Sequence, residues 1–478
     1  MRSKVGLVVL FLLISGPVVA QWSPIDPFGN YDTTLGSRIH AAMLAIYNKT
    51  FTYEQHGVVA SVIVPGLPQW NGAVGTEDDA NPMAPDYYFE IGECTKTFVA
   101  TLILQLEDSG KLSIRDPIYK YLPSYPNVDP GITIKQLLEH SSGTYDYIHD
   151  DPANTLLIDA YFANQSKRWT VDEILQNYVK TRVFTAGADY KFSNTDYLLL
   201  GLIAEKVTGN ALSAEIHRRF LAPLGLTHTL CCWSDSLPTG FAHNYTAAPD
   251  EFTPSNDYFG TDKSAQLTMA NAAAGMVSTP SDLAKWADAL YSWKFLSHQA
   301  LAEMLAFNKW TDGSYYGLGA ARIGFSTKAF YGHEGSLPGF HTMLISNPSD
   351  SITVALYMNS DMDSTDMNCS NFARAIVNQI YSPNATVRAP SSSTKNAAFV
   401  YPNPVSETTC ITFDQNISGE AFFTLYDVMG HQVRMLRDAS GTVGHHSLTL
   451  LRGDLAAGAY HYVLNWPEGT RSGNLVIE

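Results

Sequence analysis

The chain contains the stretch Phe89-Glu90-Ile91-Gly92-Glu93-Cys94-Thr95-Lys96-Thr97-Phe98. It runs into a strongly apolar segment, residues 97–106, and a Ser-Gly pair typical of a helix C-terminus follows soon after. We therefore predict a buried helix here. Glu93 and Lys96 are three residues apart, a spacing that puts both side chains on one helical face. The pattern predicts a carboxylate and an amine presented together where this helix begins.

Two further motifs follow along the chain. Tyr190-Lys191-Phe192-Ser193-Asn194-Thr195 leads into a second apolar helix, predicted at residues 196–207. Tyr331-Gly332-His333-Glu334-Gly335 comes later, and residues 342–346 and 352–358 beyond it are predicted to form two adjacent strands. Shorter stretches accompany these motifs: Gly110-Lys111-Leu112, Asp116-Pro117, His140-Ser141-Ser142-Gly143, Gly275-Met276-Val277-Ser278-Thr279-Pro280 and Tyr316-Gly317-Leu318-Gly319.

In this order the motifs resemble those of the β-lactamase-related family, which comprises class C β-lactamases, D-Ala-D-Ala carboxypeptidases and related esterases. The resemblance covers nearly all of the domain that we place at residues 24–381. It implies a β-lactamase/penicillin-binding-protein-like fold, with an antiparallel sheet flanked by helices, a helical lobe and a site between the two. The pattern of segments agrees, because strands at both ends with helices between them predict an α+β domain whose sheet is closed by its own termini.

The family's catalytic groups carry over only in part. In the family, a Ser-x-x-Lys motif supplies the nucleophile and the lysine that takes its proton, and a Tyr-x-Asn motif supplies a second hydroxyl and a substrate-binding amide. A Lys-or-His-x-Gly motif forms another wall of the site. Lys96, Asn194, His333 and Gly335 match these patterns. The resemblance therefore implies catalytic roles for Lys96 and His333 and substrate-binding roles for Asn194 and Gly335.

Both hydroxyl positions of the family pattern are altered. Glu93 stands in place of the nucleophilic serine, and Phe192 stands in place of the tyrosine. Without these hydroxyls neither an acyl-serine nor a tyrosine proton shuttle can form, so we expect penicillin acylation and β-lactam hydrolysis to be absent. Phe192 is expected to contact substrate. Tyr190 would share its face in an extended segment and could restore a hydroxyl there, although a packed tyrosine is the simpler interpretation.

Glu93 admits two interpretations. An ion pair with Lys96 would contribute about 0.3–0.5 kcal/mol and would merely stabilise an inactive site. Alternatively, the carboxylate is catalytic, as a general base for water or as a nucleophile toward an anomeric carbon. Glycosidases need a second carboxyl, for which Glu334 is the nearest candidate. Cys94 lies about 100° around the helix from Glu93 and is expected to be a small buried residue rather than a nucleophile.

Two functions follow from these interpretations. The first is a secreted hydrolase with altered, carboxylate-based chemistry on an extracellular peptide, ester or glycoside. The second is a non-catalytic pseudoenzyme that binds a peptidoglycan-like peptide or a glycan. We favour the hydrolase because the other motifs of the cleft are retained. We expect no cofactor and no metal, since the fourteen histidines and five cysteines show no metal-ligand spacing.

The two ends of the chain predict export. Residues 1–20 combine a basic start, an apolar run and a Val-Val-Ala cleavage site, the pattern of a signal peptide. Residues 382–398 are rich in Pro and Ser and predict a linker. Residues 399–478 contain short alternating segments separated by turns, which predict a small antiparallel β-sandwich.

The C-terminal segment resembles the sorting domain of the Bacteroidota type IX secretion system. The resemblance rests on Tyr401-Pro402-Asn403-Pro404, on Leu425-Tyr426-Asp427 with Gly430, and on residues 455–460 followed by a final short strand. It implies recognition by the type IX secretion machinery, passage across the outer membrane, and either release or attachment at the cell surface. A carbohydrate-binding or Ig-like sandwich is the alternative interpretation.

Charge and cysteine content narrow the range of partners. The formal net charge is −16 and no run of Lys or Arg stands out, so nucleic acids and anionic membranes are not expected partners. A hydrophobic content of 45% is sufficient for a large core without a disulfide scaffold. An odd number of cysteines leaves at least one thiol without an intramolecular partner. The sequence leaves Cys231–Cys369 and Cys232–Cys369 open as pairs.

Overall fold

A computed structural model describes residues 33–50, 57–78, 81–150, 163–245, 262–309, 313–325, 328–360, 368–381 and 398–477, the last range without 402–404, 406, 416, 428–430 and 468. The chain forms two compact units, one within Pro27–Val387 and one within Arg388–Glu478. The predicted signal peptide, nearly all of the predicted linker and Pro402 to Pro404 lie outside the described residues. None of the helices in the described ranges has the length and apolar character needed to cross a membrane.

The larger unit is built on an antiparallel sheet of eight strands in the order β2-β1-β11-β10-β9-β8-β7-β6. The first and last parts of this unit meet in the sheet, where β1 pairs with β11 and Val58 lies opposite Met358. The expected α+β fold with a sheet closed by its own termini is confirmed. The strands are β1 Gly57–Ile63, β2 Trp70–Gly75, β6 Asn308–Lys309, β7 Tyr315–Tyr316, β8 Ala321–Phe325, β9 Lys328–Leu337, β10 Phe340–Asn347 and β11 Ile352–Met358.

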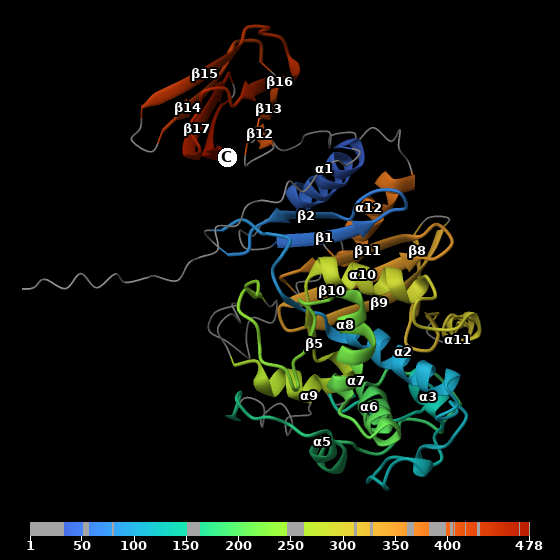
Figure 1. Ribbon diagram of the computed structural model, residues 1–478. Helices are drawn as coiled ribbons and strands as arrows, with labels where there is room; N and C mark the ends of the chain where they lie inside the picture. Colours follow the sequence, from blue (N-terminus) through green and yellow to red (C-terminus); the bar gives the residue numbers. More distant parts are fainter. Residues whose placement is uncertain are drawn as a thin grey trace, which may run out of the picture. The chain divides into compact units, whose positions relative to one another are not determined.

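Both faces of the sheet are covered, because its central strands are apolar on both sides. Side chains alternate along β1, so Val58 and Ala60 pack on one face while Val59 packs on the other. The terminal helices α1 Thr33–Thr50 and α12 Cys369–Tyr381 cover the first face. Helix α10 Pro280–Tyr291 lies against the opposite face, as Figure 1 shows.

A helical lobe packs against that opposite face (Figure 1). Its centre is α2 Thr95–Asp108, which contacts α6 Asn194–Thr208 and α9 Ser264–Ala274. Helices α2 and α6 are the two that the sequence predicts, and all three begin or end at the candidate site. The lobe also contains η2 Ile118–Lys120, α3 Ile134–Leu138, α5 Val171–Asn177, α7 Leu212–Ile216, η3 His217–Leu221, α8 Ala222–Leu224 and α11 His298–Met304.

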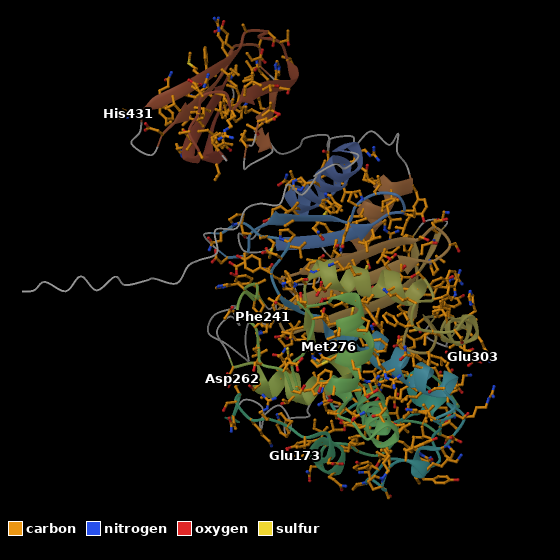
Figure 2. All side chains as sticks on the ribbon, in the orientation of Figure 1. Glu173, Phe241, Asp262, Met276, Glu303 and His431 are labelled. Carbon is orange, nitrogen blue, oxygen red and sulfur yellow. The ribbon has the colours of Figure 1, made fainter. Side chains whose placement is uncertain are left out.

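A three-stranded sheet, β3-β5-β4, joins the start of α2 to the rest of the lobe. Met276 in β5 is fully buried and lies well inside the larger unit in Figure 2. Its carbonyl accepts the N–H of Ile91, and its own N–H donates to the Thr95 hydroxyl. The turn that carries Glu93 is therefore fixed on both sides before the helix begins. The strands are β3 Phe89–Glu90, β4 Leu230–Cys231 and β5 Met276–Ser278.

The smaller unit consists of two antiparallel sheets, β12-β13-β16 and β15-β14-β17-β18. Apolar side chains from both sheets form one core, with Phe413 from the first and Phe423 and Leu464 from the second. The last strand is longer than the short one expected from the sequence. The strands are β12 Ala398–Tyr401, β13 Thr408–Gln415, β14 Ala421–Tyr426, β15 Gln432–Asp438, β16 Gly444–Leu451, β17 Gly458–Trp466 and β18 Gly469–Ile477.

No disulfide is formed among the described cysteine side chains. Cys94, Cys231, Cys232 and Cys369 are all buried, and none of them is joined to another. Neither of the two pairs left open by the sequence is therefore formed among these residues, and the side chain of Cys410 lies outside the described ones. The core of the larger unit holds together without a disulfide in its described part, as its size predicts.

Candidate active site

Lys96 is the buried centre of the site. It is fully buried in the first turn of α2, and its Nζ donates to Asn194 Oδ1 at 2.7 Å and to the Ala273 carbonyl at 3.0 Å. That carbonyl lies in the last turn of α9, where backbone acceptors lack helical partners. Burial lowers the pKa of Lys96 to about 8, although Glu93 acts in the opposite direction. The amine can therefore gain or lose a proton close to neutral pH.

Glu93 is half-buried in a short 3-10 turn, η1 Gly92–Cys94, just before α2. Its Oε2 accepts a hydrogen bond from the backbone N–H of Ser336 at 2.8 Å. The ion pair with Lys96, one of the two interpretations of Glu93, is not formed, because that amine is directed to Asn194 and Ala273 instead. Among the described residues, the hydrogen-bond partner of the Glu93 side chain is therefore the backbone of β9.

Two glycines allow β9 to approach the turn so closely. A Cβ on Gly335 would lie 2.2 Å from the Ile91 carbonyl, and a Cβ on Gly92 would lie 2.8 Å from the Ser336 nitrogen. Gly92 also has a φ of +51°, which L side chains rarely adopt. Gly335, the glycine of the third motif, therefore lets the backbone of β9 lie against the turn before α2. This contact brings the Ser336 N–H within reach of the Glu93 carboxylate.

His333 lies beneath the site rather than in its opening. Its Nε2 is 2.8 Å from the Tyr316 hydroxyl, and its Nδ1 contacts the Glu334 carbonyl. Burial, and to a smaller extent the charge of Lys96, lower the pKa of His333 to about 3. The imidazole is thus neutral at physiological pH, and its catalytic role stays a prediction. Tyr316, which sequence reasoning placed only in a supporting stretch, is the residue that orients it.

Phe192 lies over the amine where the family pattern has a tyrosine. Its ring centroid is 4.4 Å from Lys96 Nζ, a cation–π distance. Tyr190 is half-buried, with its ring 6.0 Å from that of Tyr316 and 6.3 Å from that of His140. It therefore belongs to an aromatic layer beside the site. Substrate contact by Phe192 and Tyr190 stays a prediction.

Cys94 is a packed residue, as expected. Its side chain is fully buried, and the thiol donates to the His333 carbonyl at 3.2 Å. Burial raises the pKa of Cys94 well above its ordinary value, with the charge of Glu93 adding to the effect. A protonated, buried thiol is a poor nucleophile.

A carboxylate–imidazole pair missed by the sequence reasoning completes the site. The Asn194 amide donates to Asp146 Oδ2 at 3.2 Å, and Asp146 also bonds His149 Nδ1 at 3.2 Å. Burial alone would raise the pKa of Asp146, but hydrogen bonds from His149 and from backbone N–H groups lower it. The bond to Asp146 raises the pKa of His149 above its ordinary value. The His149 side chain is 60% exposed, so it can meet a ligand.

This pair lies near the other charged groups. The side chain of Asn194 joins it to Lys96, since its Oδ1 accepts from the amine while its Nδ2 donates to Asp146. Glu93 contributes to the electrostatic environment of His149 as well as to that of Lys96. The only signal in the sequence was an Asp and a His three residues apart, which matches no family motif. The site can hold or move protons at one carboxylate, one amine and one imidazole.

Glu334 does not join this group. Side chains alternate along β9, where His333 and Gly335 are buried and Glu334 between them is exposed. Its side chain is therefore directed to the face opposite that of His333. The second carboxyl that a glycosidase mechanism needs is not supplied from this motif.

An antiparallel sheet with a helical lobe, and a lysine, asparagine and histidine-glycine pair at their junction, define the β-lactamase and penicillin-binding-protein class of fold. The Beta-lactamase family profile matches residues 42–378, which is most of the chain. The chain therefore belongs to the beta-lactamase family. Residues 399–478 match the secretion system C-terminal sorting domain. This domain directs the protein through the type IX secretion system to the cell surface or the extracellular space.

Relatives and solved structures agree with this assignment. The putative penicillin-binding protein PbpX of Bacillus subtilis is 25% identical over 58% of this chain and 63% of its own length. Penicillin-binding protein 4* of the same organism is 26% identical over 56% of this chain and 59% of its own length. The chain thus spans about three fifths of these curated relatives.

Among solved structures, D-amino acid amidase from Ochrobactrum anthropi is 25% identical, with a TM-score of 0.63, covering 73% of this chain and 99% of the amidase. A D-stereospecific amidohydrolase from Streptomyces is 24% identical, with a TM-score of 0.61, covering 74% and 99%. The second likeness concerns the fold alone. Together with the family profile, these likenesses confirm a penicillin-binding-protein-like fold.

Proposed function

We propose that the larger unit is an extracellular hydrolase in which Glu93 takes over from the missing nucleophilic serine and attack is by water. The observation that carries the proposal is Lys96, whose amine is fully buried and held by Asn194 and the Ala273 carbonyl. Burying an amine is unfavourable, and here burial lowers its pKa to about 8. A site that only had to fold could place an apolar residue here at lower cost.

Glu93 acts as the general base in this proposal. Its carboxylate reaches into the space beside β9, and substrate binding would move it away from the Ser336 N–H. The freed N–H can then donate to the carbonyl oxygen of the substrate and stabilise the negative charge that develops on it. Glu93 takes a proton from the attacking water, and the water oxygen forms the new bond to the carbonyl carbon.

His149 supplies the second proton transfer. It is exposed and is held by Asp146, which raises its pKa and keeps more of it protonated. When the bond between the carbonyl carbon and the leaving nitrogen or oxygen breaks, the imidazolium donates its proton to the leaving group. His333 is neutral and bonded to Tyr316, so its part is to position β9 and the aromatic layer.

The substrate class that we propose is an amide or ester next to a D-amino acid. The D-amino acid amidase of Ochrobactrum anthropi, a fold relative, acts on D-amino acid amides as its name states. Glycoside chemistry is less well supported, because Glu334 is directed to the opposite face of β9. Peptides of the cell wall contain such D-residues and are available to a secreted protein.

A second candidate function has one observation in its favour. The Ser336 N–H already has an acceptor in Glu93, so an unreacting carboxylate occupies the position of an oxyanion. A pseudoenzyme would use the same cleft to bind a peptidoglycan-like peptide or a glycan, with Glu93 pairing to a cationic group of the ligand. This candidate differs from the hydrolase in a measurable way, because it predicts binding without turnover.

Hydrolysis by the full chain tests the proposal. The substrates are D-amino acid p-nitroanilides, p-nitrophenyl esters, D-Ala-D-Ala peptides and p-nitrophenyl glycosides, and the variants are Glu93→Gln and Glu93→Asp. Glu93→Gln keeps the shape but removes the basic carboxylate, so turnover should fall by about 10² or more, in the usual range for a general base. Glu93→Asp should retain part of the activity.

Thr408→Ala in the smaller unit is a control that leaves the cleft untouched. If no substrate is turned over but a peptide or glycan binds by calorimetry, the binding function replaces the hydrolase. Turnover that is equal in Glu93→Gln and wild type would contradict a role for Glu93 whatever the substrate.

We also propose the export route in finer detail. Residues 1–20 act as a signal peptide for the inner membrane, residues 382–398 act as a linker, and the sorting domain is removed at or beyond the outer membrane. The pattern of residues 1–20 and the sorting-domain match support this order of events. Mass spectrometry of the secreted protein would reveal an N-terminus at Gln21 and loss of the C-terminal strands.

A further inference from the structure

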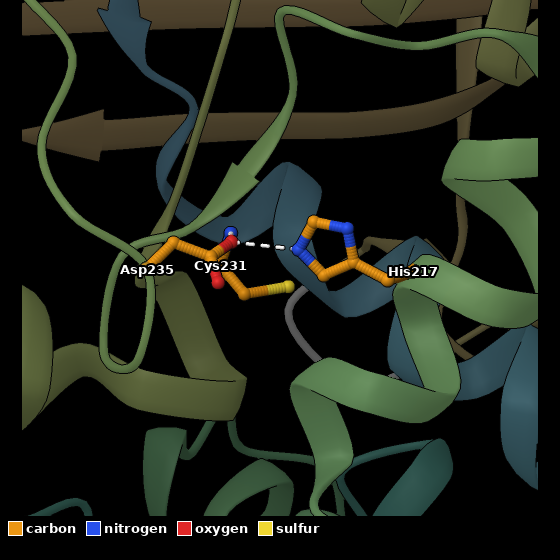
Figure 3. A group of neighbouring side chains, drawn as sticks. All are labelled: His217, Cys231 and Asp235. Atoms are coloured by element: carbon orange, nitrogen blue, oxygen red, sulfur yellow. Dashed lines mark hydrogen bonds and ion pairs between the residues drawn. The ribbon is translucent and has the colours of Figure 1, made fainter.

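Apart from the candidate active site, three unlike donor side chains converge in the helical lobe. They are His217, Cys231 and Asp235, drawn together in Figure 3. One donor atom from each lies within 4.8 Å of the other two. The imidazole Nε2 and the Asp235 Oδ2 are 2.7 Å apart. The three donor atoms are of three different elements: a nitrogen, a sulfur and an oxygen.

The backbone around His217 is irregular. This residue is the first of η3, a π-helical turn that follows α7 directly. Such turns are rare in proteins, and those that occur are frequently at functional sites. Here the turn presents the imidazole toward the loop that carries the other two donors (Figure 3). The His217 side chain is 42% exposed, so an ion can enter from solvent.

Cys231 and Asp235 are held by a closed loop. The Cys231 N–H donates to Asp235 Oδ2 at 2.7 Å, and the Asp235 N–H donates back to the Cys231 carbonyl at 2.9 Å. Cys231 itself belongs to β4 and pairs with Met276 of β5. The thiol is fully buried on the inner side, while the carboxylate is 22% exposed. Two of the three donors are therefore preorganised.

The arrangement of these three side chains suits metal ligands. It differs from that of a catalytic triad, in which a carboxylate and a nucleophile bond opposite nitrogens of one imidazole. In a Cys–His–Asp relay, the carboxylate bonds one ring nitrogen and the thiol faces the other. Here Asp235 bonds Nε2, and Figure 3 shows the sulfur on the same side of the ring as this nitrogen. The other nitrogen is directed away from both. All three donors thus face one common point.

We propose that His217, Cys231 and Asp235 form a binding site for a divalent cation of the zinc type. Thiolate, imidazole and carboxylate are the ligands that Zn²⁺ takes in proteins. On binding, the Cys231 thiol releases one proton to solvent and the thiolate forms the metal bond. Thiolate and carboxylate then balance the two charges of the ion. Three protein ligands leave a fourth position for water.

The rearrangement needed is small. Ligand atoms around a tetrahedral zinc lie roughly 3.3–3.6 Å apart, given bond lengths of about 2.0–2.3 Å. The 2.7 Å hydrogen bond between His217 and Asp235 must therefore open by under about 1 Å. The imidazole is partly exposed on a π-helical turn and can rotate to open this bond. The Cys231 sulfur, which lies within 4.8 Å of the other two donor atoms, must close on them by up to about 1.3 Å. The Cys231 N–H remains bonded to Asp235 and holds the carboxylate in place.

Cobalt titration of the full chain, reduced and freed of metal with a chelator, tests the site. Co²⁺ bound by a thiolate gives a sulfur-to-metal charge-transfer band in the near ultraviolet, and added Zn²⁺ should remove it at one ion per chain. Cys231→Ser should abolish the band. Cys232→Ser is the matched control. Cys232 is the next residue and is also buried, but its sulfur lies outside the cluster. His217→Gln should weaken cobalt binding by about tenfold or more.

Each outcome bears on the proposal. Absence of the band in the reduced, folded wild type overturns it, as does a band that persists in Cys231→Ser or disappears in Cys232→Ser. Should Cys231→Ser fail to fold, unchanged affinity in His217→Gln is equally decisive, because this exposed side chain can be altered without loss of the core. Binding at Glu77, Asp78 and His243, the other described cluster, would give no thiolate band.

Discussion

The Oε2 atom of Glu93 accepts a hydrogen bond from the backbone N–H of Ser336 at 2.8 Å. This N–H follows Gly335 in β9, at the closest approach of that strand to the turn before α2. Donors in such positions stabilise negative charge on a reacting carbonyl oxygen. Glu93 therefore changes two features of the family's site. It replaces the serine hydroxyl, and its carboxylate occupies a backbone N–H that a substrate carbonyl would use.

Penicillin should not label the wild-type protein. A fluorescent penicillin needs a hydroxyl nucleophile and a free N–H donor, and Glu93 provides neither. We expect the double variant Glu93→Ser with Phe192→Tyr to become labelled, since Lys96 and Asn194 are already bonded to each other at 2.7 Å. Gel fluorescence after denaturation measures the covalent adduct. Labelling of the wild type would contradict the loss of the acyl-serine route.

Gly335→Ala should destabilise the larger unit. The new Cβ would lie 2.2 Å from the Ile91 carbonyl, so β9 and the turn must move apart. Overpacking of this kind costs about 1–3 kcal/mol, and chemical denaturation measures it. Gly324→Ala is the matched control, because Gly324 lies in β8 of the same sheet and a Cβ added there would have no atom within 4 Å. Equal effects of the two changes would refute the close approach.

The main elements of this site were predicted from their match to the family's motifs, which lie at fixed helical positions. Lys96 and Asn194 both lie in the first turns of apolar helices, and packing of α2 on α6 brings them together. Apolar periodicity was enough to find those helices. The sheet was predictable for the same reason, since β1 and β11 are apolar runs at the two ends of one domain.

Other parts of the site leave no mark in the sequence. The Ser336 N–H is a backbone group, so any residue other than proline at that position would supply it. His149 and Asp146 lie in a loop with no helical or strand period, and only the fold brings them beside Asn194. The interpretation of Glu93 as an ion-pair partner of Lys96 fails because spacing along a helix cannot account for acceptors from other elements, such as the Ala273 carbonyl.

Lys96 should make stability depend on pH above neutrality. Its pKa is lowered from 10.5 to about 8 by burial, so between these values the unfolded chain binds a proton that the folded chain has lost. Stability therefore rises with pH in this window, by about 1 kcal/mol between pH 8 and 9 from this group. Well below pH 8 both states are protonated and the unfavourable contribution is constant.

The comparison with Lys96→Met isolates this effect. Denaturation of the two proteins at pH 7, 8 and 9 cancels the other titrating groups, and the wild type should gain more on the variant between pH 8 and 9 than between pH 7 and 8. A difference between the two proteins that stays constant from pH 7 to 9 would mean that Lys96 keeps an ordinary pKa.

His149 should control the decline of hydrolysis at high pH. In the proposed mechanism it donates a proton to the leaving group, so kcat must fall as pH rises through its pKa, which Asp146 raises above the ordinary value. We expect His149→Ala to lower kcat by about 10² and to remove this decline. The pKa of the His149 imidazole, followed by NMR, should coincide with the midpoint of the wild-type profile.

The smaller unit offers a matched control for this pair. His431, labelled in Figure 2, bonds Asp427 at 3.2 Å, the same distance as in the pair of His149 and Asp146. His431→Ala should leave both kcat and its pH profile unchanged, because the smaller unit contributes none of the residues of the proposed mechanism. If His149→Ala retains the decline at its original pH, another group donates the proton. Lys96, with a pKa of about 8, would then be the donor to examine.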